Sequence, residues 1–73
     1  MKKLFFVEAE KVFPEKHQHY FLVADSLKEA LIIVKDKEDV KKLGNDIIFT
    51  SYEISKIDNY DIVVLEKEKE NEQ

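Results

Sequence analysis

The chain has 73 residues and a formal net charge of −4, and it contains neither cysteine nor arginine. The length indicates one domain, and without cysteine neither a disulfide nor a thiolate zinc site can stabilise it. All 12 basic residues are lysine, so the bidentate arginine contacts to guanine and phosphate are absent, and with the acidic net charge this argues against a nucleic-acid partner.

The chain starts Met1-Lys2-Lys3, and only four apolar residues follow before Glu8. No small-residue cleavage site follows, so a signal peptide is not expected. No apolar run approaches the ~20 residues that span a bilayer. We therefore expect no membrane association and a cytoplasmic location.

The segment Lys3 to Glu10 is the first expected strand, because it is rich in aromatic and β-branched residues. Leu4 and Phe6 would lie on one of its faces, and Phe5 and Val7 on the other. A sheet covered by one helix needs apolar residues on one face only. The second apolar face predicts another cover, and a symmetric homodimer is the commonest arrangement.

The connection from Lys11 to Lys16 contains Pro14, which marks a turn. Val12 and Phe13 are apolar for a loop. The favoured interpretation is that they fold back on the edge of the core, and the alternative is an exposed apolar knob for a partner. The second expected strand, His17 to Ala24, pairs with the first as an antiparallel hairpin because the connection is short.

Ser26 and Glu29 form the S-x-x-E pattern of a helix N-terminus. One apolar stripe follows at helical spacing, and Ile32 and Ile33 widen it beyond the need of one sheet face. The stripe consists of Leu27, Ala30, Leu31 and Val34.

The charged run Lys35 to Asp39 interrupts the apolar pattern. Either one helix continues to Leu43, or a main helix ends near Asp36 and a separate turn covers Asp39 to Leu43. The second reading is favoured because Val40 and Leu43 are out of phase with the main stripe. Gly44 suits the left-handed position after a helix end.

Asp46 to Ile54 and Tyr60 to Glu66 are the third and fourth expected strands, joined by a turn at Asp58-Asn59. The predicted fold is an α+β domain over residues 1–66 in the order ββαββ. Its four-stranded antiparallel sheet carries one main helix on one face. Residues 67–73 are charged and polar, and a disordered tail is expected there.

The best candidate for chemistry is the pair His17 and His19, which would share one face of a strand. Glu8 and Glu10 would lie opposite them in the hairpin if the register allows, as in a zinc or manganese site. Solvent-exposed Glu–His pairs explain the same pattern without a metal. A register that puts Glu8 across from His19 would favour the metal, but the exposed pairs are the preferred interpretation, and no metal or cofactor is expected.

Other catalytic signals are absent from the sequence. Gly44 is the only glycine, so no phosphate-binding loop is present. The acids near the helix end lack the spacing of a calcium-binding loop; they are Asp36, Glu38, Asp39 and Asp46. We therefore expect a protein that is not an enzyme.

The expected function is that of a small protein-binding accessory factor acting through an acidic surface. Tyrosines are common interface anchors, although core or edge packing would also suit them. The alternative is a nucleic-acid-associated protein that stacks bases on Tyr20, Phe21, Phe49 or Tyr52. The expected protein-binding residues are Val12, Phe13, Tyr20, Tyr52 and Tyr60.

The strand-to-helix sequence Val23-Ala24-Asp25-Ser26, followed by Glu29-Ala30 and Val34, resembles small uncharacterised proteins of phages and mobile elements of low-GC Gram-positive bacteria. The Leu43-Gly44 step is similar as well. The resemblance implies a strand, a helix and closing strands. Small size, net acidity and the lack of a catalytic motif favour a role such as phage-encoded inhibition of a host enzyme or defence system. The resemblance assigns no functional residue.

Overall fold

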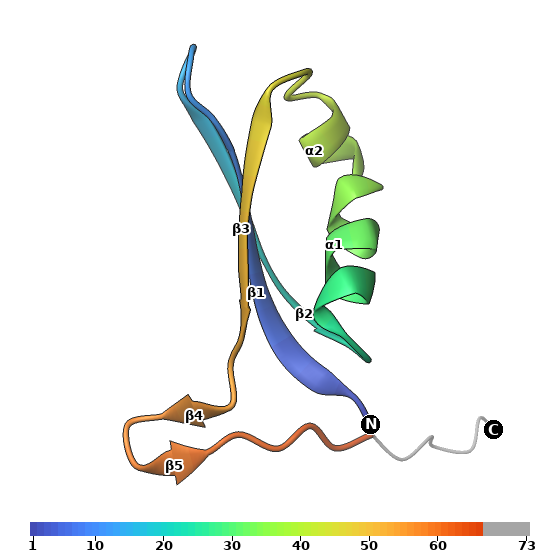
Figure 1. Ribbon diagram of the computed structural model, residues 1–73, viewed down its shortest axis with the longest axis vertical. Helices are drawn as coiled ribbons and strands as arrows, with labels where there is room; N and C mark the ends of the chain where they lie inside the picture. The colour runs from blue at the N-terminus through green and yellow to red at the C-terminus, as the bar shows by residue number, and fades with distance from the viewer. Residues whose placement is uncertain (67–73) are drawn as a thin grey trace, which may run out of the picture.

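The computed structural model describes residues 1–66, and the predicted disordered tail lies outside this range. Three antiparallel strands form a sheet with the order β2-β1-β3. They are β1 (Lys3–Lys11), β2 (Lys16–Ala24) and β3 (Ile47–Glu53). The helices α1 (Leu27–Lys35) and α2 (Glu38–Lys41) lie on one face of this sheet (Figure 1). The α+β class and the single main helix are thus confirmed.

The strand β1 is central, and its alternation decides which residues form the core. Phe5, Val7 and Ala9 are buried under the helices, whereas the residues between them are only partly covered. Ala30 and Val34 of α1 pack against this row. The core is completed by Ala24, Val40 and Leu43, and no polar or charged side chain of residues 1–66 is buried.

The helix begins as its sequence predicts. The Ser26 hydroxyl accepts a hydrogen bond of 3.1 Å from the Glu29 amide, and the Glu29 carboxylate accepts one from the Asp25 amide. The preferred reading of two helical segments is also confirmed. Gly44, with a φ of 89°, follows the second segment in the left-handed region, where glycine is favoured.

Ser26→Ala removes this cap and is expected to lower the free energy of unfolding by about 1 kcal/mol. Urea denaturation followed by circular dichroism measures the difference. Ser26→Asp serves as the control, because aspartate accepts the same hydrogen bond and should retain most of the stability. An alanine variant as stable as the wild type would contradict the role of Ser26.

The predicted four-stranded sheet is not confirmed, because the fourth strand does not join β3. Only Tyr60–Asp61 (β5) is a strand, and it pairs with Lys56–Ile57 (β4) in a separate two-stranded sheet. The expected tight turn at Asp58-Asn59 is present and joins β4 to β5. The last hydrogen bond of this hairpin runs from the Ile62 amide to the Ser55 carbonyl. The Ile54 amide still donates to the Leu4 carbonyl of β1, but the chain then enters the separate hairpin, and residues 62–66 form no strand beside β3.

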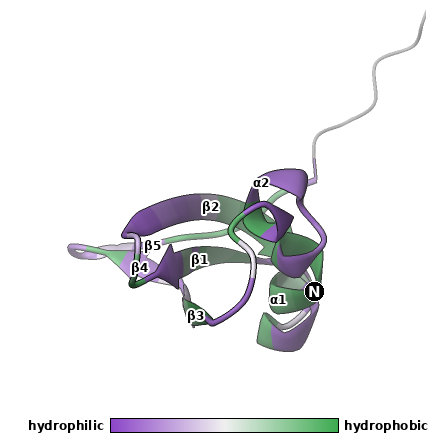
Figure 2. Cartoon of the chain, turned by 90° about the horizontal axis from the view of Figure 1, so that it is seen from above, coloured by the Kyte–Doolittle hydropathy of each residue, from purple (hydrophilic) through white to green (hydrophobic). Residues whose placement is uncertain are grey.

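The hairpin β4–β5 projects on the side of the sheet opposite the helices (Figures 1 and 2). The molecule therefore has two differently covered faces. One face packs under α1 and α2, and the other is bordered at one end by the hairpin. No helix of the described residues is long and apolar enough to cross a membrane.

Candidate functional site

The sheet face away from the helices, here called the open face, carries four rows of side chains across three strands. Antiparallel partners share a face, so the register fixes the rows. The rows run from Val23 and Leu4, through Phe21-Phe6-Tyr52 and His19-Glu8-Thr50, to His17-Glu10-Ile48.

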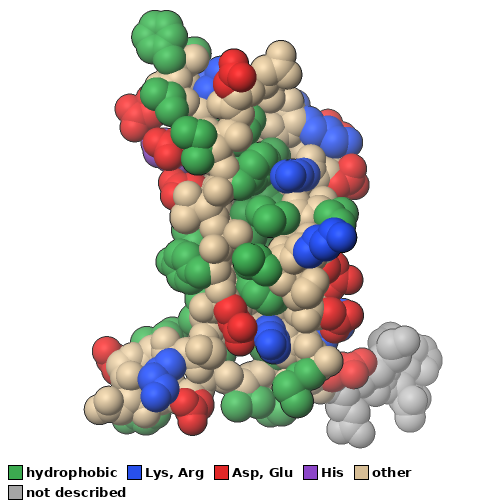
Figure 3. Space-filling view, in the orientation of Figure 1, with side chains coloured by type: hydrophobic (Ala, Val, Ile, Leu, Met, Phe, Trp, Pro, Cys, Tyr) green, Lys and Arg blue, Asp and Glu red, His purple; other side chains and the backbone are tan. Residues whose placement is uncertain are grey.

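The aromatic row Phe21-Phe6-Tyr52 is the main apolar feature of the open face. The Phe6 ring lies 5.2 Å from that of Phe21 and 5.3 Å from that of Tyr52, between centroids. The two outer residues are 68% and 53% exposed. Hydrophobic side chains accordingly appear along the margin that faces away from the helices (Figure 3). Rings supported by each other and still accessible are typical interface anchors.

The hairpin β4–β5 extends this apolar surface out of the plane of the sheet. Ile57 and Tyr60 are paired with each other and are 54% and 75% exposed. Because the hairpin projects on the side of the open face (Figure 2), sheet and hairpin form the two arms of an L. A partner that binds the open face would also meet the hairpin.

The other half of the open face is polar and carries the two histidines. A single Glu8 oxygen, Oε2, lies 3.0 Å from Nδ1 of His17 and 3.1 Å from Nε2 of His19. The second ring nitrogen of His17 lies 3.0 Å from a Glu15 carboxylate oxygen. Hydrogen bonds to Glu15 and Glu8 raise the pKa of His17 above its usual value. The register that favours a metal site, Glu8 across from His19, is present.

The residues expected to bind protein are distributed over three places. Tyr52 lies in the aromatic row, and Tyr60 lies on the hairpin. Val12 and Phe13 lie at the tip of the β1–β2 hairpin, 62% and 89% exposed. They do not fold back on the core, so of the two alternatives the exposed knob is the one present.

The prediction that Tyr20 is an exposed binding residue is corrected, because Tyr20 lies on the opposite face of the sheet from Tyr52. It pairs with Val7 in the register, and its ring packs against the core with Lys37 Nζ 5.2 Å from its centroid. Burial and then the Asp39 carboxylate raise the pKa of its hydroxyl. Its place in the strand alternation, one residue before Phe21, puts it under the helices and removes it from the exposed surface.

Phe6 was not among the predicted binding residues, and Phe21 was named only among the residues that would stack bases. Alternation in β1 already separated Phe6 from the core residues Phe5 and Val7. The signal for Phe21 was weaker, because its face depends on the register of the hairpin. Pairing of Phe6 with Phe21 and with Tyr52 brings the three rings together.

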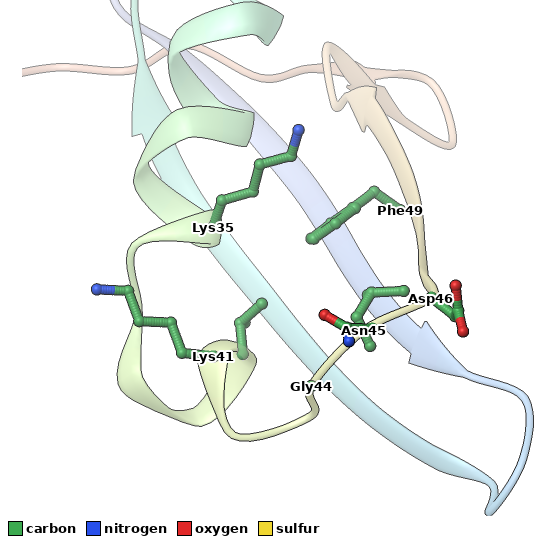
Figure 4. Close-up of a pocket in the computed structure, with 8 residues that line it drawn as sticks. Lys35, Lys41, Gly44, Asn45, Asp46 and Phe49 are labelled. Atoms are coloured by element: carbon green, nitrogen blue, oxygen red, sulfur yellow. The ribbon is translucent and has the colours of Figure 1, made fainter.

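One hollow lies on the helix side, between the two helical segments and β3 (Figure 4). Lys35 extends over Phe49, with Nζ 5.2 Å from the ring centroid. Lys41 and Asp46 point away from the hollow and from each other (Figure 4). An active site needs polar groups that converge, and these groups diverge.

Comparison with protein-family models, with curated proteins and with solved structures gives no match to this chain. Function is therefore inferred from the open face itself.

Proposed function

We propose that this chain is a non-enzymatic accessory factor that binds another protein through the open face of its sheet. The observation that carries the proposal is the exposed row Phe21-Phe6-Tyr52 on the face that no helix covers. Single exposed apolar residues are ordinary, but a contiguous aromatic patch marks an interaction surface. The exposed hairpin residues Ile57 and Tyr60 lie beside it and enlarge the surface.

The partner we propose has an apolar patch bordered by lysine or arginine. Glu8, Glu10 and Glu15 lie at the polar end of the open face or beside it, and the chain as a whole is acidic. Complementary charge steers such a partner and fixes its orientation. A phage-encoded inhibitor of a host enzyme or defence system is one protein that acts in this way.

Nucleic-acid binding is the weaker alternative. Of the four residues that would stack bases, only Phe21 and Tyr52 lie on the open face, whereas Tyr20 and Phe49 pack toward the core. The glutamates beside the aromatic row would repel phosphates, and no arginine offsets them. The charge complementarity of the face therefore favours a basic protein.

A photo-crosslinking side chain at position 52, compared with one at position 32, tests the docking face. Both positions are about equally exposed, at 53% and 59%, but Ile32 lies on the helix and not on the open face. We expect a discrete crosslinked partner from position 52 only. Equal crosslinking from both positions would contradict the proposal.

The captured protein, once purified, is titrated with the wild type and with the double variant Phe21→Ser/Tyr52→Ser. Loss of one anchor worth about 2 kcal/mol weakens binding ~30-fold, and loss of both is expected to weaken it up to ~1000-fold. Unchanged affinity would refute the role of the face. Sedimentation of the chain alone gives the other outcome: a homodimer that the double variant dissociates would assign the face to a second copy and refute the proposed partner.

A further inference from the structure

We propose that Glu8, His17 and His19 bind a divalent transition-metal ion of the zinc class at the polar end of the open face. Its ligands are not the aromatic anchors, although Glu8 also belongs to the acidic end of the docking face. Its ligand atoms all lie within 4.8 Å of one another. The three side chains come from two paired strands of one hairpin.

The backbone places these ligands before any metal is present. His17 and His19 are two residues apart on β2 and so share a face. The register places His19 directly across from Glu8, and His17 lies across from Glu10. Because β1 and β2 are paired over their full lengths, a metal would not need to order a loop in order to assemble the site.

The distances are close to those of a metal shell. Tetrahedral zinc with bonds of about 2.0–2.1 Å separates its ligand atoms by roughly 3.3–3.4 Å. The Glu8 oxygen is 3.0 Å from one imidazole nitrogen and 3.1 Å from the other. To admit the ion, the two exposed imidazoles would have to move slightly away from the Glu8 oxygen, and their nitrogens, which lie within 4.8 Å of each other, would have to come closer together. The contacts converge on one oxygen, Oε2, and not on two separate ones.

A second carboxylate, that of Glu15, holds the His17 ring through the nitrogen that faces away from the site. Glu15 lies 3.0 Å from Nε2 of His17, the ring nitrogen that does not face Glu8. A neutral His17 that donates its Nε2 proton to Glu15 presents the Nδ1 lone pair toward the site. Metal-binding histidines are commonly held in this way by a carboxylate. The His19 ring is held in turn by stacking on Phe6, at 5.9 Å between centroids.

The ligand set selects the class of ion. Two imidazoles and one carboxylate suit zinc and its neighbours, whereas calcium and magnesium take oxygen ligands. Three protein ligands leave one coordination position open, and the His17 and Glu8 side chains are 33% and 25% exposed. An ion-pair network of Glu8, His17 and Glu15 would explain the same contacts without a metal, and the experiment separates the two explanations.

Isothermal titration calorimetry of the tag-free chain with zinc chloride is the direct test. We expect saturable binding of one ion per chain. His19→Ala should lower the affinity more than ~100-fold, beyond the loss typical of an outer-shell change, and Glu15→Gln should lower it about 10–100-fold. Glu38→Gln makes the same charge change away from the site and should leave the affinity unchanged.

Cobalt(II) titration supplies a readout that an ion pair cannot produce. Bound cobalt should give the visible absorption of a low-coordinate nitrogen–oxygen site, and His17→Ala/His19→Ala should abolish it while circular dichroism confirms the fold. Lack of saturable zinc uptake by the wild type would overturn the proposal. Equal uptake by the double variant would also overturn it, because it would assign binding to surface carboxylates.

Discussion

Phe5→Ala is expected to cost about 3–5 kcal/mol of the free energy of unfolding. Phe5 is only 3% exposed and lies in the central strand, where it forms part of the core under the helices. A domain of this size has a total stability of about 4–11 kcal/mol at the usual value per residue. The variant should therefore be largely unfolded or show a much lower urea midpoint by circular dichroism.

Phe21→Ala is the matched control, because it removes the same side chain from the open face. Its ring is mostly exposed and contacts Phe6. Loss of one such aromatic contact costs about 0.5–1.5 kcal/mol. Destabilisation of the two variants by equal amounts would contradict the assignment of the two faces. With the expected outcome, position 5 serves stability and position 21 is free to serve binding.

The side-chain alternation of β1 could be read from the sequence, and this gave the two faces correctly. The pattern Leu4-Phe5-Phe6-Val7 predicted that both faces carry apolar residues, and the structure buries one set and leaves the other partly exposed. The register of the hairpin could not be read in the same way, because it depends on the geometry of its turn. The aromatic row and the Glu8–His19 pair both depend on that register.

The prediction that a fourth strand joins the sheet was wrong for a related reason. The run from Ile62 to Leu65 has the composition of a buried strand, but composition does not say which edge a strand will join. A tight turn closes residues 60–62 onto residues 55–57, so this segment pairs with its own neighbour and not with β3. Which partner a strand takes depends here on the geometry of the turn, which no periodicity records.

For the helix the sequence prediction was correct. Its apolar stripe was predicted to be wider than one sheet face requires. Val34 is fully buried, whereas Ile32 is 59% exposed on the same helix. Some residues of the stripe therefore form the core, and others remain on the surface. The two positions can be distinguished by one substitution made at each.

Val34→Asp is expected to lower the free energy of unfolding by about 4 kcal/mol or more, because it places a carboxyl group among apolar side chains without a partner. Ile32→Asp makes the same change at an exposed site near the carboxyl end of α1, where the helix dipole disfavours an acid by about 0.3–1 kcal/mol. Urea denaturation of both variants at pH 7 measures the difference.

A large loss from Ile32→Asp would show that this side chain is buried in solution, by a second copy or by a different seating of the helix. Repeating the measurement over a range of protein concentrations separates these cases, since only burial by a second copy makes the unfolding midpoint depend on concentration. A small loss of unfolding free energy at every protein concentration would show that only one face of α1 is buried. The open side of the sheet would then be the main apolar surface left for a partner.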